Sequence, residues 1–154
     1  MIIRKGQIED MSEMQLMFVD TITSVCSADY DIQQIKVWTS SIENVQRWND
    51  ILTEQFVLIA QEEGRIVGFA TLRDGNYLDL LYVHKDYQRQ GIAHKLYYEI
   101  ENEAMSSGQT ELTSDVSITA KPFFEKAGFQ VINQQTVIRQ GVEFTNFKMM
   151  KELM

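Results

Sequence analysis

The sequence predicts an α+β fold in which helices flank a mixed, largely antiparallel sheet. Two observations predict it. The hydrophobic period is helical over roughly the first third of the chain and then changes to short β-rich runs, and one long helical stretch later separates the central runs from the last ones. The chain has 154 residues, 44% hydrophobic and 23% charged, which suffices to bury a core. No linker or repeat divides it, so we expect a single domain over residues 1–154.

Residues 1–4 are expected to form a short strand. Apolar residues at steps of three and four then predict a helix, and the same spacing continues in a second stretch, after which residues 44–52 are expected to add a short turn. The first stripe comprises Met11, Met14, Phe18, Ile22 and Val25, and the second comprises Ile32, Ile35, Trp38 and Ile42.

The β-rich runs at residues 56–60 and 66–70 are joined by a short charged connection that contains a glycine, which predicts an antiparallel hairpin. The run 77–83 is apolar except at Asp79, as is typical of a central strand covered on both faces. A long helix over residues 91–107 is predicted by apolar residues at steps of four, namely Ile92, Leu96, Ile100 and Ala104.

The last third is expected to contain a short strand, a short helix and a closing hairpin. We expect Gly128 to end the helix. If Thr119 is its N-cap, Pro122 lies in the first turn, where its missing N–H has no intrahelical partner anyway. The expected ranges are 111–115 for the strand, 119–127 for the helix, and 129–139 with 142–149 for the hairpin, which turns at Gln140-Gly141.

Charge and cysteine content narrow the classes of function. There are 14 Lys and Arg against 22 Asp and Glu, a formal net charge of −8, which disfavours nucleic acid as a partner because phosphate contacts need a basic surface. No apolar run approaches the roughly 20 residues of a membrane span, and the first residues lack the apolar region of a signal peptide. The single cysteine, Cys26, cannot form an internal disulfide and is expected to be a buried thiol, so we expect a cytoplasmic protein.

The loop between the central strand and the long helix is the most informative segment. At a helix start several backbone N–H groups lack partners and the macrodipole favours an anion, so a phosphate can bind there. Gly91 permits close approach of the backbone to a ligand, and the small Ala93 leaves room on the next turn. On these residues alone, an ordinary tight connection remains the alternative.

A larger pattern surrounds this loop. It consists of Gln88-x-x-Gly91-x-Ala93, the preceding Leu81-Tyr82-Val83 and the downstream segment FFEKAGF at residues 123–129. The pattern and the order of elements resemble the GNAT superfamily of acetyl-CoA-dependent N-acetyltransferases. A narrower likeness to the small bacterial YafP-like group is carried by Asp29-Tyr30, Gln34-Ile35, Trp38, residues 122–125 and residues 141–147.

The resemblance implies that the strands matching residues 78–83 and 111–115 splay apart and form a slot for acetyl-CoA. It also implies direct acetyl transfer to a primary amine of a small molecule or peptide in a ternary complex, with a backbone N–H near Tyr82 or Val83 holding the developing oxyanion. A homodimer is common in the family. The cofactor-binding residues so implied are Leu81, Tyr82, Val83, Gln88, Arg89, Gln90, Gly91, Ile92, Ala93, Ser117 and Phe124.

Two residues depart from the family pattern. Phe124 stands where many members have a tyrosine that serves as general acid, and Ser117 stands where asparagine is frequent. Because Phe124 has no proton to donate, another group or water protonates the thiolate, or the thiolate leaves unassisted. A CoA-binding regulator that has lost turnover is the alternative that this departure raises.

Other candidates keep two interpretations each. Asp79 is either the general base or a structural carboxylate that pairs with Arg or Lys. Tyr30 and Trp38 belong either to the helix core or to the lining of the acceptor site. His84 and His94 lie near enough to the loop to contact phosphates, and no metal site is expected because neither has further ligands at suitable spacing. The segment 141–147 lines the acceptor pocket or is an ordinary hairpin.

Overall fold

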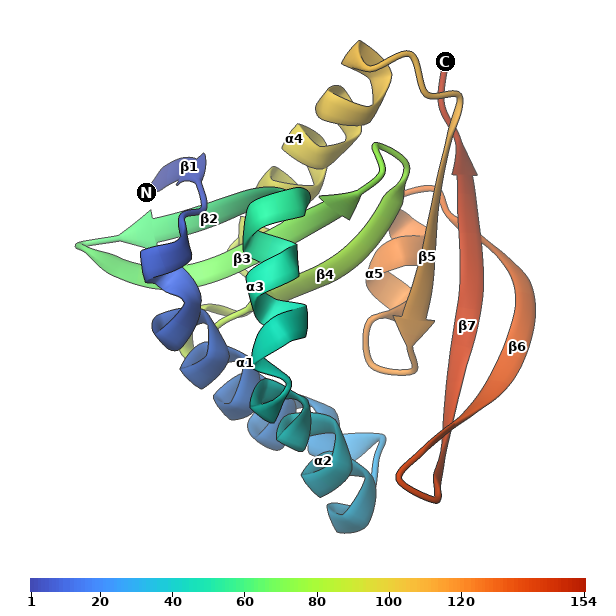
Figure 1. Cartoon of the computed structure of the whole chain (residues 1–154). Helices are drawn as coiled ribbons and strands as arrows, with labels where there is room; N and C mark the ends of the chain where they lie inside the picture. Colours follow the sequence, from blue (N-terminus) through green and yellow to red (C-terminus); the bar gives the residue numbers. More distant parts are fainter.

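Seven strands form one sheet in the order β1-β2-β3-β4-β5-β7-β6 in the computed structural model, which describes residues 1–154 (Figure 1). Every neighbouring pair is antiparallel except β4 and β5, which are parallel. The predicted α+β fold with a largely antiparallel sheet is therefore confirmed. The strands are β1 (Ile2–Lys5), β2 (Phe56–Glu62), β3 (Arg65–Arg73), β4 (Tyr77–Val83), β5 (Glu111–Ser117), β6 (Gln130–Arg139) and β7 (Val142–Glu152).

Helices cover both faces of the sheet and give the protein two hydrophobic cores. On one face α1, α2 and α3 bury residues such as Phe18, Ile35 and Trp48, and on the other α4 and α5 bury residues such as Leu96 and Phe124. Figure 1 shows α3 in front of the sheet and α4 behind it. None of the helices combines the length and apolar character that a bilayer crossing requires. The helices are α1 (Met11–Val25), α2 (Ile32–Thr39), α3 (Val45–Glu54), α4 (Ile92–Ser106) and α5 (Lys121–Lys126).

Three expectations of local detail were wrong. Residues 44–52 were expected to add a short turn, whereas residues 45–52 belong to the ten-residue helix α3. Ile32 was expected in the apolar stripe but is 87% exposed, because it is the first residue of the eight-residue α2 and its side chain lies beyond the buried face. Thr119 was the candidate N-cap of α5, whereas Ala120 occupies that position and the Thr119 hydroxyl donates to Asp29 Oδ2 at 2.8 Å. Pro122 does lie in the first turn of α5, as predicted.

Short turns with left-handed backbone join the paired strands. Glu63 and Gly64, between β2 and β3, have φ of 49° and 78°, and Gln140 and Gly141, between β6 and β7, have φ of 51° and 75°. Positive φ at both central residues is the geometry that favours glycine at the second position of tight hairpins. The predicted turn at Gln140-Gly141 is confirmed.

The sheet divides between β4 and β5. These strands share a single paired position, Tyr77 with Thr113, whereas β5 pairs with β7 along its whole length from Glu111 to Ser117. Beyond Tyr77 the two strands therefore diverge, and the sheet consists of a β1–β4 part and a β5–β7 part that meet at one end (Figure 1). The predicted splay of the central strands is confirmed.

Candidate active site

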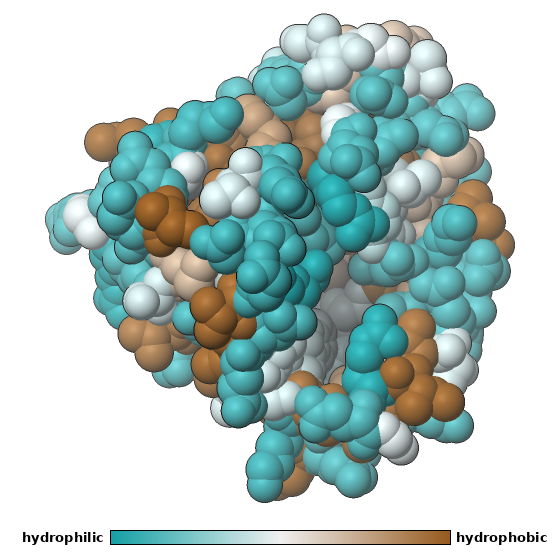
Figure 2. All heavy atoms as spheres, in the orientation of Figure 1, coloured by the Kyte–Doolittle hydropathy of each residue, from teal (hydrophilic) through white to brown (hydrophobic).

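A cleft of about 1380 Å³ opens where β4 and β5 diverge. Its walls come from α1 to α3 on one side, β4 and the start of α4 at its base, and β5 with the β6–β7 hairpin on the other side. In the space-filling view it is a hollow with hydrophilic residues along its rim (Figure 2). All the cofactor, catalytic and acceptor residues predicted from the sequence line it, except Gln90.

The edge of β4 presents backbone groups to this cleft. The His84 N–H donates to Val67 O at 2.8 Å, and Val83 is in register with Gly68. Along an antiparallel strand, the backbone N–H and C=O groups of successive residues point alternately toward and away from the partner strand. Since the His84 N–H faces β3, the Tyr82 N–H also faces β3, while the N–H groups of Leu81 and Val83 face the gap. Of the two amides predicted to hold an oxyanion, the Tyr82 amide is therefore turned away and the Val83 amide points into the cleft.

The loop before α4 forms a cradle of backbone N–H groups. Arg89 and Gly91 adopt φ of 61° and 81°, and no protein acceptor binds the N–H groups of residues 88–94. Alternating left-handed residues before a helix make an anion-binding concavity, to which the helix dipole adds partial positive charge. A Cβ added at Gly91 would have no protein atom within 4 Å, so glycine there leaves the cradle open.

Side chains beside the loop hold it in place. Gln88 Nε2 donates to Val83 O at 2.6 Å, which fastens the loop to the end of β4. His84 is 5% exposed, and its ring nitrogens lie 3.0 Å from the Asp86 backbone nitrogen and 3.2 Å from Arg65 Nη2. His84 is therefore absent from the cleft lining, in contrast to the prediction that it could contact phosphates, while His94 does line the cleft.

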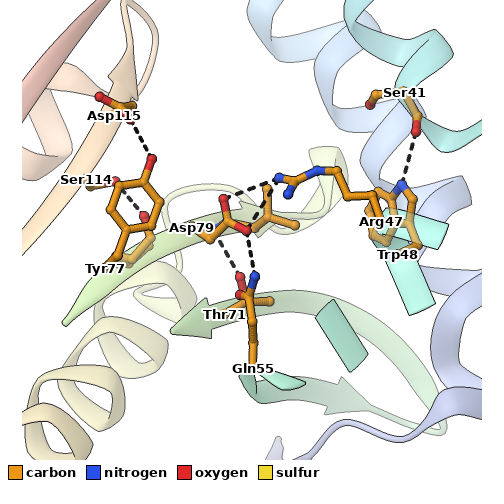
Figure 3. Close-up of polar contacts among 11 residues, drawn as sticks. Ser41, Arg47, Trp48, Gln55, Thr71, Tyr77, Asp79, Ser114 and Asp115 are labelled. Atoms are coloured by element: carbon orange, nitrogen blue, oxygen red, sulfur yellow. Dashed lines mark hydrogen bonds and ion pairs between the residues drawn. The ribbon is translucent and has the colours of Figure 1, made fainter. Parts of the chain in front are cut away.

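Asp79 lines the cleft, and hydrogen-bond donors surround its carboxylate (Figure 3). The pairing of β3 with β4 skips Asp79, because Leu80 pairs with Thr71 and Leu78 with Leu72, so the residue occupies a bulge. Its side chain is 7% exposed and lies 3.3 Å from Arg47 Nη2 through Oδ1. Gln55 Nε2 donates to Oδ2 at 2.8 Å. The pairing with arginine that the sequence left open is present, and Asp79 still lines the cleft.

A second carboxylate faces Asp79 from the opposite wall. The Tyr77 hydroxyl donates to Asp115 Oδ2 at 2.6 Å (Figure 3). Gln135 Nε2 donates to Asp115 Oδ1 at 2.7 Å. Burial and the neighbouring carboxylate of Asp115 raise the pKa of Tyr77, so the phenol keeps its proton at neutral pH. Sequence analysis missed this group, because β4, β5 and β6 bring it together from distant segments.

Aromatic residues form the inner wall near α2. Tyr30 is 6% exposed and packs edge-on against Trp38, with ring centroids 5.2 Å apart, and both residues line the cleft. They thus belong to the helix core and to the cleft wall at once.

Cys26 is buried as predicted, and burial raises the pKa of its thiol to about 11. Phe124 is 3% exposed and packs against Phe129 at 5.0 Å.

Ser117 ends β5 on the wall opposite the loop. Its Oγ accepts a hydrogen bond from the Ala120 N–H at 3.1 Å, which leaves its own O–H able to donate into the cleft. No group of three or more His, Cys, Asp or Glu side chains is arranged to hold a metal ion.

Comparison with known proteins agrees with this architecture. The family model of the acetyltransferase (GNAT) domain matches residues 26–151. The uncharacterized N-acetyltransferase YafP of Escherichia coli (strain K12) is 38% identical over 147 residues, which are 96% of this chain and 93% of that protein. The crystal structure of a GCN5-related N-acetyltransferase (Aminotransferase, Class-II) from Rhodopseudomonas palustris has a TM-score of 0.95 at 32% identity, covering 99% of this chain and 95% of that chain.

A more distant structure shares the fold. The PaiA N-acetyltransferase of Thermoplasma acidophilum, in complex with coenzyme A, has a TM-score of 0.81 at 21% identity and covers 99% of this chain and 98% of that chain. The fold and the matches define the class as an acyltransferase. The chain belongs to the GNAT family of acetyltransferases, as an acetyl-CoA-dependent N-acetyltransferase similar to YafP.

Proposed function

We propose that the protein transfers an acetyl group from acetyl-CoA to a primary amine of a small molecule or peptide by direct attack in a ternary complex. The observation that supports it is one continuous cleft, with the N–H cradle and the β4 edge at one end and the Asp79 compartment at the other. The only cysteine, Cys26, is buried with a raised pKa, which disfavours an acyl-enzyme route through a thiolate. The homodimer and the cytoplasmic location stay predictions.

The residues present fit coenzyme A. The free N–H groups of residues 88–94 and the open space at Gly91 suit a pyrophosphate, and the side chain of Arg89 stands beside them. The gap-facing amides of Leu81 and Val83 suit the amide-bearing pantetheine arm, with the Ser117 hydroxyl across the gap. Ile92 and Ala93, at the start of α4, line the cleft beside these N–H groups. Gln90 does not line the cleft, so we leave it out of this assignment.

Two protein groups would act on the reaction. The Val83 N–H stabilises negative charge that develops on a thioester carbonyl oxygen at the β4 edge. Asp79 accepts the proton of the amine, directly or through one water, and Arg47 and Gln55 hold its carboxylate in one orientation. Phe124 cannot protonate the leaving thiolate, which is a fair leaving group because thiols have pKa values of about 8.5.

The first test is thermal unfolding with acetyl-CoA, CoA and ATP at equal, near-saturating concentration. A ligand at about 100 times its Kd adds about 2.7 kcal/mol to the free energy of unfolding, which at this size raises Tm by roughly 5 to 10 °C. We expect such a rise with acetyl-CoA and CoA and little with ATP. A panel of amines and peptides then measures amine-dependent release of CoA. Tight acetyl-CoA binding without release of CoA with any acceptor class would count against the enzyme assignment.

Replacing Asp79 by Asn tests the base. We expect kcat to fall by about 100-fold or more, with loss of the acidic limb of the pH–rate profile, because a general base contributes roughly 10² to 10⁴. The matched control is Asp50→Asn in α3, which changes another carboxylate outside the cleft lining. If Asp79→Asn lowers only the Tm and leaves the pH–rate profile intact, Asp79 is a structural partner of Arg47.

A further inference from the structure

The segment between α1 and α2, together with the first turn of α2, contacts the β5–β7 part of the sheet. We call residues 29–34 of this segment the bridge. Its Tyr30 hydroxyl donates to Thr145 O on β7 at 2.8 Å and accepts from the Ile118 N–H, one residue beyond β5, at 3.0 Å. Asp29 Oδ2 accepts from the Thr119 hydroxyl at 2.8 Å, and Gln34 Nε2 donates to Glu143 O at 2.8 Å.

These contacts act where the sheet itself provides no support. Past Tyr77 no ladder joins β4 to β5, whereas β5 is bound to β7 at seven positions, so the end of β5 moves with β7. Two side-chain hydrogen bonds, from Ser114 Oγ to Leu78 O and from the Tyr77 hydroxyl to Asp115, join β4 and β5 directly near Tyr77. Farther along, the width of the gap depends on contacts that tie the β5–β7 part to the helices packed on β4. The bridge supplies such contacts, since its α1 neighbour Phe18 packs against Tyr82 of β4 with ring centroids 5.0 Å apart.

Tyr30 is the member of the bridge best placed to set this width. Its side chain is buried, and its ring packs against Trp38 and Phe144, with centroids 5.2 Å and 6.2 Å away, so the hydroxyl is held in one position. The hydroxyl thus donates one hydrogen bond to β7 and accepts another from the residue after β5. The segment that it fixes comprises Ser117 at the end of β5 and the following Thr119 and Ala120, all of which line the cleft.

We propose that Tyr30 is a positioning residue for the acetyl-CoA slot: through Ile118 it holds the end of β5, and with it Ser117, at the distance from β4 that the cofactor requires. The proposal rests on the proposed acetyl-CoA site. Because the same ring lines the acceptor end of the cleft, the bridge also connects the wall of the amine site to the wall of the cofactor site.

The test compares Tyr30→Phe, which removes only the hydroxyl, with Tyr98→Phe, which removes the hydroxyl of an exposed tyrosine on α4 outside the cleft lining. The Kd for CoA is measured by calorimetry well below the Tm of each variant. We expect Tyr30→Phe to weaken CoA binding about threefold to tenfold, the factor that corresponds to the net contribution of one hydrogen bond, and Tyr98→Phe to leave the Kd unchanged. The KM for acetyl-CoA should rise in parallel, with a smaller change in kcat.

An unchanged Kd in Tyr30→Phe, or an equal change in Tyr98→Phe, overturns the proposal. If Tyr30→Phe does not fold, Thr119→Val is the substitute, because it frees the same loop from Asp29, and Thr119→Ser should restore the affinity. Unchanged CoA affinity in Thr119→Val then overturns the proposal. Failure of the wild-type protein to bind CoA is a distinct outcome, since it refutes the proposed acetyl-CoA site itself.

Discussion

Substituting Gly91 separates the backbone requirement of the loop from its requirement as a ligand site. Gly91 has φ of 81°, and a Cβ there would meet no protein atom within 4 Å, so Gly91→Ala is destabilising only through the left-handed backbone. That cost is about 1 to 2 kcal/mol, or a fall in Tm of roughly 2 to 8 °C at this chain length. Gly64 is the matched control, because its φ is 78° and its Cβ would also meet nothing within 4 Å.

The two alanine variants should therefore lose similar stability and differ in affinity. Aspartate at position 91 adds a negative charge beside the proposed phosphate site, which weakens binding by about 1 to 3 kcal/mol, or about fivefold to more than a hundredfold. We expect calorimetry with CoA to show this loss for Gly91→Asp and wild-type affinity for Gly64→Asp. Equal Kd values in the two aspartate variants, both still folded by their unfolding curves, would refute the assignment of the loop.

Two further predictions concern titratable groups. The Arg4 guanidinium donates to Asp10 at 2.8 and 2.9 Å and holds the pKa of that carboxyl below its usual range, so the free energy of unfolding should fall as pH drops below about 4. Urea unfolding of Asp10→Asn should show lower stability at pH 7 and a weaker dependence of stability on pH in acid. The same pH dependence in the variant as in the wild type would contradict this. Burial raises the pKa of the Cys26 thiol to about 11. A disulfide reagent at pH 8 should therefore label Cys26 far more slowly in the native protein than in the urea-unfolded protein, and equal labelling rates would show that the native thiol is accessible.

The parts of the fold that depend on neighbours in sequence could be predicted, and the parts that depend on distant partners could not. The hairpin turn at Gly141 and the helix start at Gly91 are decided by local backbone conformation, which the residue type indicates directly. The start of α5 is decided otherwise: the Thr119 hydroxyl binds Asp29, 90 positions earlier, and the cap passes to Ala120. Periodicity contains no information about such a partner.

The candidate site divides in the same way. The segment from Val83 to Ala93 is contiguous, so its place beside the cleft and its left-handed glycine could be predicted from one stretch of sequence. The direction of the Tyr82 amide depends on the register of β4 with β3, and the contact between Tyr77 and Asp115 joins strands 38 positions apart. Neither is visible until the strands are paired.

The division also explains why the fold identifies the reaction class and leaves the acceptor open. The end of the cleft that we propose for acetyl-CoA consists largely of backbone N–H groups of β4 and α4, which most side-chain substitutions leave unchanged. The end that we propose for the acceptor consists of side chains from several elements, including the Asp79–Arg47 pair and the Asp115 carboxylate held by Tyr77. Those side chains can change without disturbing the cradle, so one scaffold can keep acetyl-CoA and exchange its amine. In this chain two carboxylates on opposite walls flank the compartment, and an acceptor screen should begin with amines that carry a second cationic group.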